Sequence, residues 1–131
     1  MRDKLIFIGI AIMFVAVASF SRGSSESDHP RYQDYTEEAY VTHQGKVRVL
    51  FFHAAWCPSC RSADAGFKQA PNDIPEQIVV FKVDYDKERE LKKKYAIAYQ
   101  HTFVQVDADG EAVSKWSGGA LDKMLEEIKL D

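Results

Sequence analysis

The only two cysteines of this 131-residue chain, Cys57 and Cys60, lie three positions apart in the stretch AAWCPSCR. Two thiols at this spacing can perform disulfide exchange, because one thiolate attacks a disulfide sulfur and the second thiol resolves the mixed disulfide. Pro58 suits a first helical turn, which predicts that Cys57 lies at a helix N-terminus. Free backbone N–H groups and the helix dipole there lower a thiol pKa below its usual value of about 8.5. Cys60, one turn further along, is expected to be more buried.

Two other kinds of cysteine site are alternatives to a redox pair. A purely structural disulfide between these positions would close a very short loop and contribute on the order of 2 kcal/mol. A zinc site of the usual kind needs further ligands, and the chain has no second Cys-x-x-Cys pair. The spacing, the strand before it and a location outside the cytoplasm favour redox chemistry.

The elements that must position the cysteines follow from the apolar pattern. Residues 47–52 form an almost continuous apolar run, interrupted by one arginine, and residues 78–86 repeat this pattern. Such runs are typical of strands covered by helices on both faces, and ligands usually bind beyond the carboxyl ends of these strands. Residues 102–116 predict a hairpin with Asp109 and Gly110 in its turn.

Helical patterns alternate with these strands. The apolar stripe of Leu121, Met124, Leu125 and Ile128 marks the last helix. The order of elements predicts a small α/β domain over residues 35–131, with a mixed central β-sheet flanked by helices. The predicted helices cover residues 35–44, 59–70, 87–95 and 121–130.

The first 20 residues are expected to be a signal peptide or an N-terminal membrane anchor. Arg2 and Lys4 precede an apolar run over residues 5–20, which is slightly short for a membrane span of about 17–25 residues. Ala16 and Ala18 supply the small-residue pattern of a cleavage site. Residues 21–34 are predicted to be a polar linker. Both alternatives place the domain outside the cytoplasm, either periplasmic or secreted, or anchored by residues 5–20.

The charge of the chain excludes one class of partner. The formal net charge is −3 and the pI is about 5.8. A nucleic-acid-binding domain of this size would carry a basic surface. We therefore expect no nucleic-acid partner.

Four segments, in this order, resemble the thioredoxin family: VLFFHAAWCPSC, FKVDYD, YAIAYQHTFVQVDADGE and WSGGALDKMLEEI. The resemblance covers about residues 35–131 and implies a thioredoxin-like fold. It also implies a thiol–disulfide oxidoreductase with a redox-active disulfide, Cys57–Cys60, and no other cofactor. Its partners would be protein thiols or disulfides, with a membrane electron donor as one source of electrons.

The resemblance also assigns roles to individual residues. Cys57 would be the attacking thiol, Cys60 the resolving thiol and Trp56 the aromatic shield beside them. Lys82 matches a lysine near the family's active site, although a solvent-side strand lysine is an equal alternative. The remaining residues expected to line the substrate groove or tune the thiols are Pro58, Ser59, Gln100, His101, Thr102 and Gly118.

Three positions depart from the family pattern. Thioredoxins keep a buried aspartate under the cysteine pair as proton acceptor, and Phe51 stands there in this chain. Fast reductase turnover of the thioredoxin kind is therefore not expected. A helix proline is replaced by Ala65, which predicts a straighter helix. The family's cis-proline is replaced by His101, so the bond before it is either a costly cis bond or a trans bond in a reshaped loop.

An imidazole at position 101 has two functions open to it. As a cation it would stabilise the Cys57 thiolate and make the disulfide more oxidising. As a neutral ligand it would join Cys57 and Cys60 in a metal site, with His53 as a fourth ligand. For His53 we favour the plainer interpretation of a core-strand histidine whose ring is satisfied by the backbone.

The sequence therefore predicts an extracytoplasmic thiol–disulfide oxidoreductase that works through a mixed disulfide. The main rival is a thioredoxin-like binding module that holds zinc, copper or an iron–sulfur cluster, the cluster being completed by a second protomer. A third alternative is a membrane-tethered interaction domain with a permanent disulfide. The direction of the redox reaction is not predicted.

Overall fold

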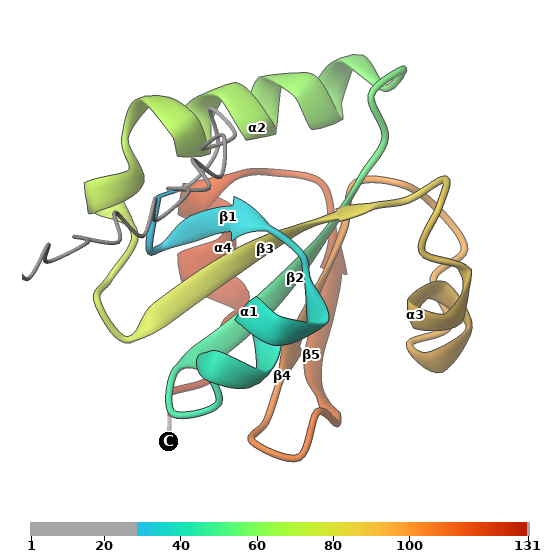
Figure 1. The fold of residues 1–131 in the computed structure, drawn as a ribbon. Coiled ribbons are helices and arrows are strands. Elements are labelled where there is room, and N and C mark those ends of the chain that lie inside the picture. Colours follow the sequence, from blue (N-terminus) through green and yellow to red (C-terminus); the bar gives the residue numbers. More distant parts are fainter. Residues whose placement is uncertain (1–28, 131) are drawn as a thin grey trace, which may run out of the picture.

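The computed structural model describes residues 29–130, which form a five-stranded mixed sheet with helices on both faces. The elements in chain order are β1 (Tyr32–Asp34), α1 (Glu37–Thr42), β2 (Val47–His53), α2 (Pro58–Gln69), η1 (Pro71–Asp73), β3 (Ile78–Asp84), α3 (Arg89–Lys94), β4 (Thr102–Val106), β5 (Ala112–Ser117) and α4 (Leu121–Glu127) (Figure 1). The predicted α/β fold with a mixed central sheet is confirmed. The predicted signal or anchor lies outside the described residues. Within residues 29–130, no helix has the length and apolar character needed to cross a bilayer.

The strands lie in the order β1-β3-β2-β4-β5. β2 is central: it runs parallel to β3 and antiparallel to β4, which forms the predicted hairpin with β5. Five successive residues of β2 are buried, as expected for a strand covered on both sides. Its carboxyl end leads through a short loop into α2, so β2 delivers the cysteine pair to one end of the sheet (Figure 1).

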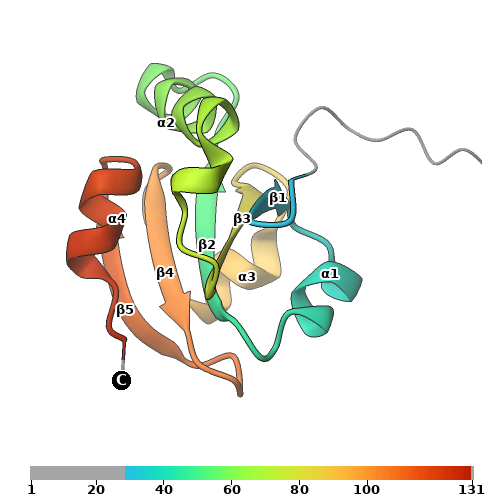
Figure 2. The same ribbon diagram turned by 90° about the vertical axis from the view of Figure 1, so that its left-hand side faces the viewer.

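Two hydrophobic cores fill the faces of the sheet. Figure 2 shows α2 and α4 on one side and α1 and α3 on the other. The α2–α4 core contains both cysteines, whereas the α1–α3 core is built around Phe81. A stack of three aromatic rings runs through the first core: Phe51 lies 4.5 Å from Phe103, and Phe103 lies 5.3 Å from Trp116, with nearly parallel rings. Both cysteines belong to the same hydrophobic core as this stack of Phe51, Phe103 and Trp116, which we call the aromatic floor.

Two segments differ from the sequence prediction. Residues 32–34 lie in the stretch expected to be linker, but they form β1 and pair in parallel with β3. Only Tyr32 is buried there, so three residues give no detectable pattern. The last helix ends at Glu127 instead of residue 130, because Ile128 has an extended backbone and the side-chain amide of Gln105 bonds both the N–H and the C=O of Lys129.

Candidate functional site

Cys57 is the N-cap residue of α2, as the position of Pro58 predicted. Its Sγ accepts a hydrogen bond from the Cys60 N–H at 3.4 Å and lies 3.2 Å from the Ser59 hydroxyl. The bond to Ser59 is the main cause that lowers the pKa of Cys57 to about 7, although burial partly opposes it. Gln100 adds a smaller lowering contribution. About half of the Cys57 side chains are therefore thiolate at pH 7.

Cys60 lies one turn along α2 and is completely buried. Burial is the main cause that raises its pKa to about 11, and the neighbouring Cys57 raises it further. Both cysteines are reduced in this structure. The pair thus contains one nucleophile that is ready at neutral pH and one thiol that stays protonated until it is needed.

His101 lies directly beside this pair. Its peptide bond is trans, since the described residues contain no cis peptide, and its φ of 56° lies in the left-handed region that few residues other than glycine adopt. The ring is 2.9 Å from the Ser59 hydroxyl through Nδ1 and 2.7 Å from the Gly119 carbonyl through Nε2. It packs against Phe51 and Phe103. Of the two conformations that the sequence left open, the structure has the trans bond and a reshaped loop.

The other predicted groove residues have separate tasks. Trp56 is 57% exposed, and its indole N–H donates to the Asp86 carboxylate at 3.1 Å, which fixes an apolar surface beside Cys57. Thr102 makes no bond to the cysteines and donates to the Tyr99 carbonyl instead, which secures the turn before His101. Gly118 has φ of 76°, and its N–H donates to the His101 carbonyl.

Lys82 does not bond to either sulfur. Its register partner is Phe51, so it extends from the same sheet face towards α2. Its Nζ lies 3.2 Å from Asp34 and 3.4 Å from Asp64, a carboxylate one turn beyond Cys60. The lysine therefore ties β1, β3 and α2 together.

Asp64 does not replace the missing proton acceptor. Burial would raise its pKa, but hydrogen bonds from Tyr32 and Lys68 and the charge of Lys82 outweigh burial and lower it. The Tyr32 hydroxyl donates to Asp64 at 2.6 Å. A carboxylate stabilised in this way is a weak base, and Phe51 contributes none.

The alternative metal ligands do not form a ligand set. Between residues 29 and 130, no three His, Cys, Asp or Glu side chains are placed to hold a metal ion. Both ring nitrogens of His101 already have partners, so ligation would require the ring to leave Ser59 or Gly119. His53 ends β2 as expected, but its buried Nε2 has no hydrogen-bond partner among the residues that the structure describes, contrary to the expectation of a satisfied ring. Burial is the main cause that lowers the His53 pKa.

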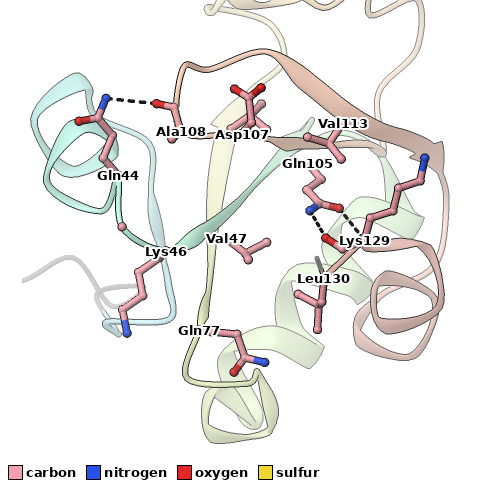
Figure 3. Close-up of a pocket in the computed structure, with 12 residues that line it drawn as sticks. Gln44, Lys46, Val47, Gln77, Gln105, Asp107, Ala108, Val113, Lys129 and Leu130 are labelled. Carbon is pink, nitrogen blue, oxygen red and sulfur yellow. Dashed lines mark hydrogen bonds between the residues drawn. The ribbon is translucent and has the colours of Figure 1, made fainter.

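Two hollows lie at opposite ends of the sheet. One, of about 520 Å³, lies beside the cysteine loop and is lined by His53, Ala55, Lys82 and Asp86, among others. The other, of about 500 Å³, lies at the start of β2 beside Val47 (Figure 3). Gln105 holds Lys129 of the C-terminal segment at one side of the second hollow. Only the first is near the thiols.

Sequence reasoning missed Asp64 and Gly119. Gly119 has φ of 82°, and a Cβ added to it would lie 2.5 Å from the Cβ of Lys123, so only glycine presents this carbonyl to His101. The Gly118-Gly119 pair was the available signal for a special backbone. The pairing of Asp64 with Lys82 joins elements distant in sequence and left no local pattern.

The chain is similar to known proteins along most of its length. The thioredoxin family model matches residues 31–129. Thioredoxin H5 of Oryza sativa is 31% identical over 79% of this chain and 73% of its own length. Protein disulfide isomerase-like 2-3 of the same species is 26% identical over 85% of this chain, which spans only 26% of that longer protein.

Solved structures agree with the sequence comparisons. Reduced Schistosoma mansoni thioredoxin pre-protein is 30% identical, with a TM-score of 0.59, over 72% of this chain and 88% of the other. The germline-specific thioredoxin Deadhead of Drosophila melanogaster is 26% identical, with a TM-score of 0.60, over 72% and 92%. Cys57 and Cys60 thus lie in a thioredoxin fold.

Proposed function

This chain belongs to the thioredoxin family of redox proteins, and we propose that it is a thiol–disulfide oxidoreductase that acts on protein partners outside the cytoplasm. The observation that carries the proposal is the contrast between the two thiols. Cys57, at the N-terminus of α2, has a pKa of about 7, whereas the buried Cys60 has a pKa of about 11. Only the first is a good nucleophile at neutral pH.

The proposed reaction has two exchanges. The Cys57 thiolate attacks one sulfur of a partner disulfide, forms a mixed disulfide and releases the other partner sulfur as a thiolate. Cys60 then attacks Cys57, and the second partner sulfur leaves as a thiol because it takes up the proton that Cys60 loses; the product is a Cys57–Cys60 disulfide. Two electrons pass to the partner, and the reverse sequence oxidises a partner dithiol. A second dithiol, such as that of a membrane electron donor, would restore the reduced pair.

The exposed Trp56 supports a protein as the partner. Its indole is fixed by Asp86 next to Cys57 and presents a rigid apolar surface. Tyr99, 72% exposed, precedes the loop of His101 and adds a second aromatic side chain. Aromatic residues of this kind are common anchors in protein interfaces.

A trapping experiment tests this function. Cys60→Ser should accumulate mixed disulfides with partner proteins, because the resolving thiol is absent while Cys57 remains reactive. Cys57→Ser is the matched control and should trap none. If Cys60→Ser forms no adducts in cells that express the full chain, the proposal is wrong.

The proposed location rests on residues 1–20. N-terminal sequencing of the protein purified from its host distinguishes the two forms. A mature chain that begins after Ala18 supports a cleaved signal, and a retained N-terminus in the membrane fraction supports an anchor. An uncleaved chain in the cytoplasmic fraction would overturn the location.

A further inference from the structure

We propose that Ser59 and His101 form a proton relay for Cys57, in which His101 is the acid–base group and Ser59 the positioning link. The inference deepens the proposed function and rests on it. Three contacts connect the groups in one line: Cys57 Sγ to Ser59 Oγ at 3.2 Å, Ser59 Oγ to His101 Nδ1 at 2.9 Å, and His101 Nε2 to the Gly119 carbonyl at 2.7 Å.

The carbonyl at the end of this line fixes the direction of every hydrogen bond. A carbonyl oxygen only accepts, so His101 Nε2 must carry a hydrogen. In the neutral ring Nδ1 is then an acceptor, and the Ser59 hydroxyl donates to it. The Ser59 oxygen is left to accept the hydrogen of the Cys57 thiol. Each member of the line therefore has one defined partner in the protonated state of Cys57.

The same contacts hold when the proton has moved. Cys57 gives its proton to Ser59 Oγ while Ser59 passes its own proton to His101 Nδ1. The product is a thiolate that accepts from Ser59 and an imidazolium that donates to Ser59 and Gly119. One proton is transferred, no net charge is created, and no heavy atom needs a new partner. The proton on His101 is then available to the partner sulfur that leaves as a thiolate.

The backbone of the loop holds His101 for this task. Its left-handed conformation is uncommon for a residue other than glycine, and strain of this kind often accompanies a functional site. Two backbone bonds of 2.8 Å maintain it, from the His101 N–H to the Phe52 carbonyl and from the Gly118 N–H to the His101 carbonyl. Gly119 must stay glycine to present its carbonyl.

Few other charges act on the ring. Its packing partners from β2 and β4 are the neutral rings of Phe51 and Phe103. From α2 the ring meets Ser59, and the Cys60 thiol lies close to the His101 backbone. Lys123 of α4 lies against Gly119, but its Nζ donates to the Ser117 carbonyl. Cys57 is thus the titrating group that His101 contacts through Ser59.

The test compares thiol ionisation in matched variants of the reduced protein. His101→Asn tolerates a left-handed backbone but cannot take up a proton, and Ser59→Ala removes the link. In each variant, alkylation of Cys57 by iodoacetamide at pH 6 should fall about tenfold, equivalent to one pKa unit. The double variant should fall no further, because both changes interrupt the same relay.

Two controls match these substitutions. Ser62→Ala changes an exposed serine of the same helix, and His43→Asn changes a histidine that packs on Phe81 across the sheet. Both should keep the wild-type pH profile. The relay is overturned if His101→Asn or Ser59→Ala also keeps that profile, or if their effects add fully in the double variant.

A nuclear magnetic resonance titration of the His101 ring separates a relay from a merely structural contact. In the wild type the titration midpoint should differ between the reduced and disulfide forms, and in Ser59→Ala this difference should vanish. An equal midpoint in both wild-type forms refutes the relay. These measurements need no partner protein, so a failed relay leaves the trapping by Cys60→Ser intact, and failed trapping leaves the pH profiles intact.

Discussion

Iodoacetamide at pH 7 is expected to alkylate Cys57 of the reduced protein about a hundred times faster than Cys60. The pKa values of about 7 and about 11 set the supply of thiolate. Half of Cys57 is ionised at this pH, against about one Cys60 in ten thousand, so supply favours Cys57 by about 5,000-fold. The Cys60 thiolate is intrinsically the better nucleophile. A Brønsted slope of about 0.4–0.5 over four pKa units makes it about 40–100 times more reactive than the Cys57 thiolate. The net preference is about 50–125-fold.

Burial adds little to this preference, because Cys57 is 4% exposed and Cys60 has no exposed surface. The assay is a short reaction with limiting reagent, followed by peptide mapping to quantify the label on each cysteine. Cys60→Ser should keep the fast rate, and Cys57→Ser should show only the slow one. Equal labelling of the two cysteines, or faster labelling of Cys60, would refute the assignment of attacking and resolving thiols.

Three further changes test the fold and the site. Phe51→Ala removes a buried ring stacked 4.5 Å from Phe103 and should lower the free energy of unfolding by about 3–5 kcal/mol, measured with denaturant; a loss below about 1 kcal/mol would contradict the aromatic floor. His101→Pro should destabilise the protein by more than about 1 kcal/mol. Proline cannot adopt a φ of 56°, and it lacks the N–H that donates to the Phe52 carbonyl. An unchanged Tm would contradict the loop geometry. Relative to the disulfide form, the reduced protein should gain stability from pH 7 to 9, because the unfolded state binds more protons at Cys57 than the folded state does. It should lose stability from pH 9 to 11, because the folded state keeps the proton of Cys60. The same pH dependence of Tm in the reduced and disulfide forms would contradict this ionisation pattern.

The sequence predicted most of the fold because the main elements have long, regular patterns. The buried run of β2, the Asp109-Gly110 turn and the apolar stripe of the last helix each identify an element locally. Strand β1 escaped prediction because only Tyr32 of its three residues is buried. The early end of α4 depends on Gln105, which is distant in sequence from the residue that it holds.

The site was predictable to the extent that it is local. The position of Cys57 at a helix N-terminus follows from the strand before it and Pro58 after it. The contact of His101 with Ser59 depends on a left-handed backbone and on ring packing across three elements, so spacing alone could only indicate that a histidine lay near the thiols. The ion pair of Lys82 with Asp64 could not be predicted from the sequence for the same reason.

The ionisation of Cys57 prepares the site for attack but contributes little to the direction of the redox reaction. At pH 7 the thiolate and thiol forms of Cys57 are about equally populated, so ionisation only doubles the population of the reduced state relative to a fully protonated pair. For a two-electron couple a tenfold change corresponds to about 30 mV, and a twofold change therefore to about 9 mV. This shift in reduction potential is small compared with the difference of about 150 mV between strongly reducing and strongly oxidising dithiol–disulfide proteins. A lowered pKa is thus evidence for fast attack by Cys57, and the choice between reducing and oxidising partners must depend on the stability of the Cys57–Cys60 disulfide itself.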